Sequence, residues 1–194
     1  LETYPVPPSG APIAVAAYPN SYATGMSNLG FHFVYSSLSR SGRFRVQRHF
    51  LGDPAGRETP TALFFTVSYE EDLLNLARIL VSFDIEPLRE KRAGSPLVIA
   101  GGPVVSSNPA PFLPLADVLA AGEGEPVMPI IIDSVADWGQ DRGVLASRLS
   151  GVDGVILPGI HETAVSAGPA DPLLFQHSAM LAGDAAFADM FLVE

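Results

Sequence analysis

The sequence predicts one doubly wound α/β domain built on mainly parallel strands, and three observations support this prediction. Short apolar runs alternate with stretches of helical period, as in successive strand–helix–strand units. Glycine-rich turns follow several of the apolar runs, where the strands of such a sheet would end. The chain has 194 residues, 47% of them hydrophobic, so it can bury a sizeable core within one domain.

The expected strands are short apolar runs bounded by turn residues. They comprise residues 13–17, 44–50, 62–67, 96–100, 117–121 and 152–157. The second run alternates apolar and polar side chains, which is typical of an edge strand with one wet face. We therefore expect a mainly parallel five-stranded sheet of flavodoxin-like order 2-1-3-4-5, followed by a C-terminal linker or arm.

The expected helices are stretches in which apolar residues recur at helical spacing. They comprise residues 27–39, 68–83, 127–138 and 141–149. Ser27 or Asn28 is the expected cap of the first helix, and Gly42 marks its end. Acidic residues open the second helix, where they suit the helix dipole, and Pro126 fits the first position of the third.

The domain organisation follows from local composition. Residues 1–10 hold three prolines and read as an extended lead-in, residues 11–160 form the domain, and residues 161–194 read as a linker ending in a strand at 187–193. The start carries neither a methionine nor a signal peptide, so we expect an excised piece of a longer, cytoplasmic protein.

Charge and cysteine content exclude several function classes. The formal net charge of −10 argues against nucleic-acid binding, although arginines gather over residues 40–48. The chain has no cysteine, which excludes disulfides and cysteine-ligated metal or iron–sulfur sites within it. No apolar run reaches the roughly 20 residues of a membrane helix, so we expect no membrane contact.

Four loops are expected together at the carboxyl ends of the strands, the usual ligand edge of an open α/β sheet. These loops are residues 19–30, 68–70, 101–106 and 122–125. Their glycines permit close approach of the backbone to a ligand, although glycines also simply end strands in such folds. The candidate binding residues are Tyr22, Gly25, Met26, Ser68, Tyr69, Gly101, Gly102, Gly122, Glu123 and Gly124.

The aromatic residues near these strand ends leave two interpretations open. Tyr18, Tyr22, Phe31 and Tyr69 either stack on a flat ring or pack against another part of the protein. Glu123 and Glu125 read better as a hydroxyl acceptor or a helix cap than as paired catalytic acids.

Catalytic and metal motifs are absent from the sequence. The first loop lacks the three-glycine dinucleotide fingerprint, and no Gly-x-Ser-x-Gly elbow occurs. The histidines stand without metal-ligand spacing, so we expect no metal site and no catalytic residue. The four are His32, His49, His161 and His177. A stand-alone flavodoxin-like or response-regulator-like module is disfavoured, because the first loop lacks a phosphate loop and an acidic pocket.

Five segments resemble a group of radical SAM proteins with an N-terminal domain of the cobalamin-binding type. They are residues 18–30, 65–70, 98–103, 122–125 and 187–194. The last, Phe-Ala-Asp-Met-Phe-Leu-Val-Glu, is similar to the strand that precedes the CxxxCxxC motif in such proteins. The resemblance spans nearly the whole chain and implies a piece that stops just before the radical SAM domain.

The resemblance implies a cofactor-binding domain that performs no catalysis by itself. Its partner would be the radical SAM domain downstream, where the [4Fe–4S] cluster and S-adenosylmethionine would bind. Cobalamin would lie against the strand ends, but the Asp-x-His-x-x-Gly motif that ligates cobalt in cobalamin mutases is missing from residues 22–26. The alternative is a scaffold domain that binds no ligand and packs on the radical SAM barrel.

Overall fold

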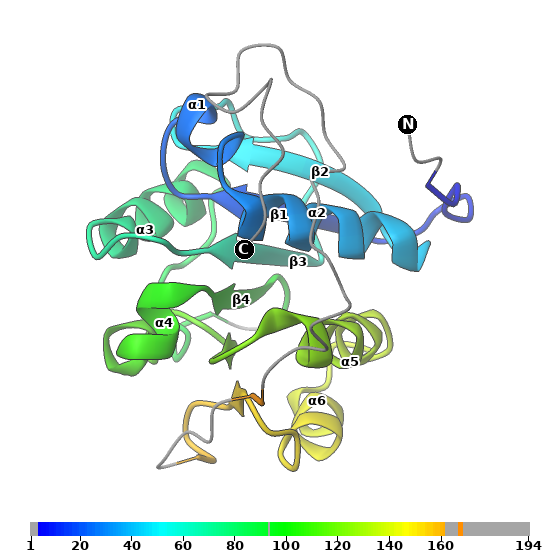
Figure 1. The fold of residues 1–194 in the computed structure, drawn as a ribbon. Coiled ribbons are helices and arrows are strands. Elements are labelled where there is room, and N and C mark those ends of the chain that lie inside the picture. The colour runs from blue at the N-terminus through cyan, green and yellow to red at the C-terminus, as the bar shows by residue number, and fades with distance from the viewer. Residues whose placement is uncertain (1–3, 93, 162–166, 169–194) are drawn as a thin grey trace.

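A six-stranded sheet lies between two layers of helices in the computed structural model, which describes residues 4–92, 94–161 and 167–168 (Figure 1). The strands are β1 (Ile13–Tyr18), β2 (Arg45–Phe50), β3 (Ala62–Thr66), β4 (Leu97–Gly101), β5 (Val118–Ala120) and β6 (Val155–Ile156). The helices are α1 (Tyr22–Gly25), α2 (Leu29–Ser41), α3 (Asp72–Ser82), α4 (Pro103–Ser107), α5 (Gly124–Ala136), α6 (Arg142–Leu149) and the 3₁₀ turn η1 (Ala110–Phe112).

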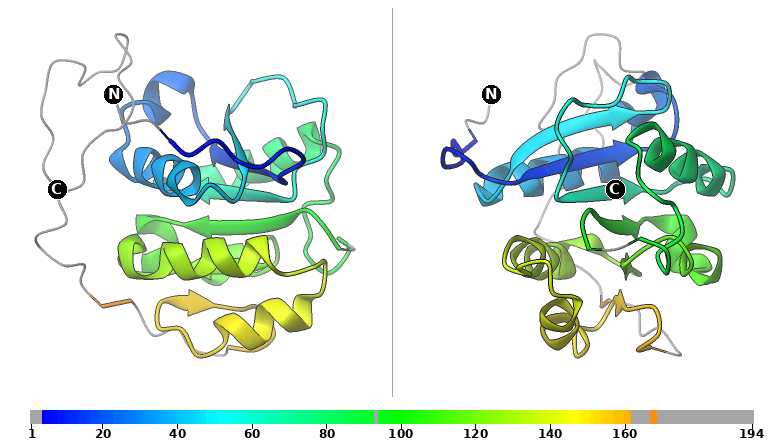
Figure 2. Two further views of the ribbon diagram at one scale, coloured as in Figure 1. Left: turned by 90° about the vertical axis from the view of Figure 1, so that its right-hand side faces the viewer. Right: turned by 180° about the vertical axis from the view of Figure 1, so that it is seen from behind.

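The strand order is β2-β1-β3-β4-β5-β6, which confirms the doubly wound, flavodoxin-like fold class. The predicted count of five strands is wrong, because β6 also joins the sheet and runs antiparallel to β5. Two helices in succession explain the reversal. Helix α5 returns the chain to the amino ends of the strands, and α6 then leads it back, so β6 begins at the opposite end from β5 (Figure 2).

Helices α2, α5 and α6 cover one face of the sheet, and α3 and α4 cover the other (Figure 2). The parallel strands β1, β3 and β4 are therefore buried on both faces, as their continuous apolar sequence requires. Strand β2 keeps exposed side chains and forms the edge, as its alternation predicts. No helix among the described residues is long and apolar enough to cross a membrane.

The helix caps follow the sequence closely. Asn28 accepts a hydrogen bond from the Phe31 amide at 2.8 Å and begins α2, and Gly42 ends it with a φ of 63°. Helix α5 begins earlier than expected, so that Pro126 is its third residue rather than its first. Helices α1 and α4 lie in stretches that the sequence presented as loops.

A buried ion-pair network centred on Asp117 holds together the amino ends of β4 and β5. The Asp117 carboxylate, at the start of β5, accepts hydrogen bonds from Arg92 at 2.9 Å, Arg142 at 2.8 Å and the Val98 amide at 2.9 Å. The Arg92 and Asp117 side chains are 3% and 2% exposed. Because buried charges require partners, this network makes the amino end of the sheet a rigid base.

The predicted linker lies largely outside the described residues, as do the strand at 187–193 and His177. Within the linker the structure describes His161, Ala167 and Gly168. The Ala167 amide donates to the Ala121 carbonyl at 2.9 Å, and Ala167 forms a parallel bridge with Gly122. The chain has thus returned to the carboxyl end of the sheet by residue 167.

Candidate ligand pocket at the carboxyl ends of the strands

A cavity of about 380 Å³ opens at the carboxyl ends of β3, β4 and β5, on the face that α2 and α5 cover. Its apolar wall consists of Phe33, Val34, Phe64, Ile99 and Met128. Its rim carries five glycines at the strand ends and the adjoining helix starts, namely Gly30, Gly101, Gly102, Gly122 and Gly124. This is the edge at which doubly wound folds bind ligands, and the volume lies within the usual range for small-molecule sites.

The structure brings half of the candidate residues together at this cavity. Gly101, Gly102, Gly122, Glu123 and Gly124 all line it. The other five candidates belong to the loops after β1 and β3 and do not line it. They are Tyr22, Gly25, Met26, Ser68 and Tyr69. The cavity therefore covers only part of the predicted site.

Packing accounts for most of the loop after β1. A Cβ atom at Gly25 would lie 2.5 Å from Cε1 of Phe50, so glycine permits α1 to press against β2. Met26 is buried, and the Tyr22 ring packs edge-on against Phe50 with centroids 5.1 Å apart. Tyr18 and Phe31 also form a buried edge-on pair, so the core interpretation holds for these two aromatic residues.

Hydrogen bonds to Asp72 and Ser68 join the loop after β1 to the loop after β3. The buried Asp72 carboxylate accepts from the amides of Ser68 and Tyr69 at 3.1 and 3.0 Å and from the Asn20 side chain at 3.3 Å. Asn28 donates to the Ser68 hydroxyl at 3.1 Å. Burial raises the pKa of Asp72, although these hydrogen bonds oppose the rise. From the sequence alone, Asp72 is expected only to suit the dipole of the helix that it begins.

Thr66 is a cavity residue that the sequence analysis missed. It is 5% exposed, it lines the cavity at the end of β3, and its Oγ1 is buried without a hydrogen-bond partner among the described residues. A Cβ at Gly30 would lie 3.5 Å from the Thr66 methyl carbon, so the methyl group faces Gly30. Rotation about the Cα–Cβ bond to another staggered rotamer would place the hydroxyl where the methyl group now lies, beside Gly30 at the cavity.

The rim glycines have structural as well as spatial roles. Gly102 has a φ of 115°, and a Cβ there would lie 2.4 Å from the Val67 carbonyl oxygen. Only glycine therefore lets the loop after β4 lie against the end of β3. The Gly122 amide donates to the Ser106 hydroxyl at 2.9 Å, which joins the loops after β4 and β5.

At the mouth of the cavity, the positive end of a helix dipole lies beside two negatively charged carboxylates. Helix α5 points its amino end at the rim, and its cap residue Glu123 makes no side-chain capping bond. Free amides at this end attract negative charge, whereas the carboxylates of Glu123 and Glu125 repel it. A neutral group with a hydrogen-bonding edge suits this mouth better than a free anion.

The described histidines do not face the cavity. Burial lowers the pKa values of His32 and His49, and a backbone hydrogen bond with Met26 partly opposes the shift at His32. The His49 ring packs on Phe83. His161 lies beyond β6, where Nδ1 accepts from the Leu157 amide at 3.1 Å and Nε2 lies 3.0 Å from the Ser150 carbonyl oxygen. Within the described part of the chain, no three acidic or histidine side chains gather as metal ligands do.

Comparison with known proteins identifies the family. The model of the family "Radical SAM proteins, N-terminal" matches residues 58–158, just over half of the chain. The uncharacterized protein MJ0966 of Methanocaldococcus jannaschii is 32% identical over 122 residues. That match covers 62% of this chain and 26% of the relative, so the chain spans about a quarter of that protein's length. No solved structure matches the chain. The chain therefore belongs to the radical SAM proteins, as an N-terminal domain of that family.

Proposed function

We propose that the carboxyl-end cavity holds part of a cobalamin-type cofactor, and that this domain presents the cofactor to a radical SAM domain of the same protein. The observation that carries the proposal is the cavity itself, with an apolar wall, a glycine rim and an unpartnered buried hydroxyl. Burying a hydroxyl without a partner costs about 1–3 kcal/mol, a cost that a ligand hydrogen bond would offset. The chain performs no catalysis by itself in this proposal.

The cavity residues suit the tail of such a cofactor better than its ring. The volume of about 380 Å³ accommodates a planar aromatic group such as the tail benzimidazole, and is smaller than a whole corrinoid. Phe33, Phe64 and Ile99 supply apolar contact to such a group, and Thr66 supplies a hydrogen bond to its edge nitrogen. The remainder of the cofactor would lie over the loops that carry Gly102 and Gly122.

No described side chain supplies a histidine ligand for cobalt at this edge. The loop in which related folds carry the histidine is here α1, whose residues pack on Phe50. The proposal is therefore cobalamin binding without a protein histidine on the metal. Bound cobalamin would supply cobalt-centred group-transfer chemistry, while the cluster and S-adenosylmethionine would bind in the cysteine-bearing part of the longer protein.

Retention of hydroxocobalamin tests the proposal directly. The longer protein, carrying this chain and its cysteine-bearing region, is incubated with hydroxocobalamin and passed through a gel-filtration column. We expect corrin absorbance to elute with the protein in a near one-to-one ratio. Elution of the protein without corrin absorbance would refute cobalamin binding.

A substitution at Thr66 tests the assigned role of its hydroxyl. Thr66→Val removes the unpartnered Oγ1 and keeps the shape of the side chain. We expect unchanged or slightly higher stability without ligand, since no described hydrogen bond is lost, and about tenfold weaker cobalamin binding. Unchanged affinity would remove Thr66 from the site without affecting the retention result.

The second candidate function is a scaffold that packs on the radical SAM domain and binds no cofactor. Tyr22 and Tyr69 are 40% and 49% exposed on the carboxyl-end loops, and Ala167 brings the chain back to the same edge at Gly122. These features favour an interface there. The scaffold predicts that substitutions of Tyr22 and Tyr69 by Ser weaken association between the two domains while no corrin is retained by the unmodified protein.

A further inference from the structure

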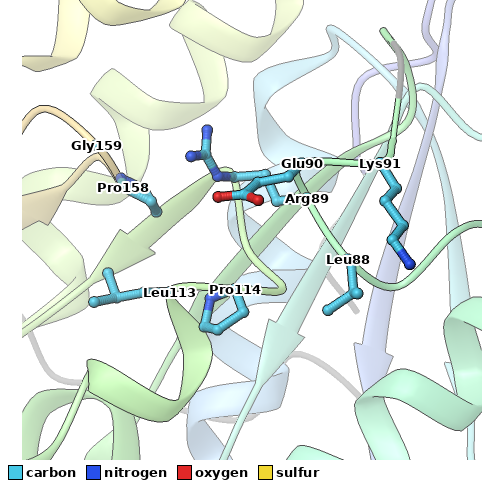
Figure 3. Close-up of a pocket in the computed structure, with 8 residues that line it drawn as sticks. All are labelled: Leu88, Arg89, Glu90, Lys91, Leu113, Pro114, Pro158 and Gly159. Atoms are coloured by element: carbon cyan, nitrogen blue, oxygen red, sulfur yellow. The ribbon is translucent and has the colours of Figure 1, made fainter.

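A second cavity, of about 370 Å³, lies at the opposite end of the sheet from the proposed cofactor site (Figure 3). Three segments that are distant in sequence form it, at residues 88–91, 113–114 and 158–159. These segments precede β4, precede β5 and follow β6, so the cavity lies at the amino ends of β4 and β5. Neither the sequence analysis nor the family comparison assigns it a role.

The cavity holds cations that lack partners. Among the described residues, three of the eleven lysines and arginines, Arg57, Arg89 and Lys91, have neither an ion pair nor a side-chain hydrogen bond. Two of these three, Arg89 and Lys91, line this cavity. In a chain of net charge −10, two unpaired cations at one concave site favour a negatively charged ligand.

The Arg89 guanidinium is the half-buried cation of the pair. A Cβ at Gly159 would lie 3.6 Å from Arg89 Nη2, so Arg89 extends across the loop after β6. Figure 3 shows Arg89 and Glu90 on the side of the cavity near Pro158, and Lys91 apart from them. Glu90 makes no ion pair with Arg89 and lowers the positive charge of the site.

The backbone around Arg89 is held in place before any ligand binds. The Arg89 amide donates to the Pro114 carbonyl at 2.8 Å, which joins two of the three segments. The buried Arg92 guanidinium binds the carbonyls of Glu86 and Pro87 at 2.8 and 3.0 Å and fixes the turn that carries Arg89. Arg92, next in sequence to the lining residue Lys91, shares the single carboxylate of Asp117 with Arg142, which leaves one further positive charge.

The remaining wall is apolar. Leu88, Leu113, Pro114 and Pro158 surround the space beside the guanidinium. A ligand that matches both parts carries one carboxylate on a compact apolar body. We propose that this cavity binds a small monocarboxylic acid, whose carboxylate pairs with Arg89 while its apolar body contacts Leu88, Leu113 and Pro114. The proposal is independent of cobalamin binding at the other end of the sheet.

Benzoate is the probe, and its neutral isostere benzamide is the control ligand. Both are titrated into the ¹⁵N-labelled 194-residue chain while amide shifts are followed by NMR. We expect saturable benzoate shifts at Leu88, Leu113 and Gly159, and no saturable shift with benzamide. Equal binding of the two compounds, or benzoate shifts that do not saturate, would overturn the proposal.

Three variants test the charges. Arg89→Gln is expected to weaken benzoate binding about tenfold, since it removes a charge-assisted hydrogen bond. Glu90→Gln is expected to strengthen it, because a repelling carboxylate is lost. Arg57→Gln removes the third unpaired cation, which lies outside the cavity, and should change nothing. Within the described part of the chain these three side chains make no hydrogen bond or ion pair, so all three variants should fold. Unchanged binding in Arg89→Gln would contradict the assignment.

Discussion

The buried ion-pair network at the amino ends of the strands permits a prediction with an internal control. Among the residues that the structure describes, two aspartates each bind two arginines. Asp117 does so in the interior, where its side chain is 2% exposed, and Asp137 does so at the surface, where Arg43 and Arg148 are its partners. Substitution of each by asparagine removes the same charge from the same number of ion pairs.

Asp117→Asn is expected to lower the free energy of unfolding strongly. Breaking a buried pair costs about 3–5 kcal/mol, because the remaining charge stays buried. Arg92 would keep its hydrogen bonds to the carbonyls of Glu86, Pro87 and Leu115. The loss in the free energy of unfolding should therefore lie near the lower limit, at about 3 kcal/mol. For a domain whose total stability is about 5–15 kcal/mol, this is a large fraction. Asp137→Asn should change stability little, because solvent screens its exposed pairs.

Urea unfolding followed by the fluorescence of Trp138, the single tryptophan, measures both effects. With a denaturant slope of about 2–3 kcal/mol per M, Asp117→Asn should lower the unfolding midpoint by about 1–1.5 M. The Asp137→Asn midpoint should stay near that of the parent chain. Equal midpoints for the two variants would refute the claim that burial makes the Asp117 network structurally important.

Two further predictions concern the sheet and its loops. Gly102→Ala would place a Cβ 2.4 Å from the Val67 carbonyl oxygen, at a backbone φ of 115°. We expect the free energy of unfolding to fall by about 2 kcal/mol or more, or the variant to fail to fold, and the melting temperature to fall with it. A melting temperature equal to that of the parent chain would contradict this. The pKa of buried His49 lies below its ordinary value of 6.5, so the stability from keeping it neutral is complete above pH 6.5 and is lost as pH falls toward the lowered pKa. His49→Phe should therefore lessen the loss of stability between pH 7.5 and 5, measured by urea midpoints. An unchanged pH dependence would contradict this and would assign the loss of stability to other groups, such as His32.

The strand order could be predicted because the order of apolar and polar residues in each strand indicates whether the strand lies at the edge or inside the sheet. The alternation of β2 placed it at the edge, and the continuous apolar runs of β1, β3 and β4 placed them inside. The direction of β6 could not be predicted in this way. Periodicity identifies a strand but not its direction, which here depends on the two successive helices before it.

The candidate site was only partly predictable, because glycines are visible in a sequence and long-range packing is not. The rim glycines Gly101 and Gly122 follow apolar runs and were found. Gly25 lies in the loop that follows the apolar run of β1, yet its role depends on Phe50, which lies on another strand. In the loop after β3, the sequence pattern favours Ser68 as the binding residue. Strand alternation places Thr66 on the same face as Phe64, and this signal would have identified Thr66 instead.

The most direct test of the account compares two matched glycine substitutions. Gly30 and Gly143 are each the second residue of a helix, and a Cβ at either lies near the side-chain oxygen of the cap residue, at 3.3 Å from Asn28 and 3.1 Å from Asp141. Gly30 lines the carboxyl-end cavity, whereas Gly143 lies on α6, away from it.

The measurement is the dissociation constant for hydroxocobalamin in the longer protein carrying Gly30→Leu or Gly143→Leu. The account predicts at least roughly tenfold weaker binding for Gly30→Leu, since leucine at this position enters the cavity and overpacks it. Gly143→Leu should bind as the parent protein does. Equal affinity in the two variants would contradict the assignment of this cavity as the cofactor site.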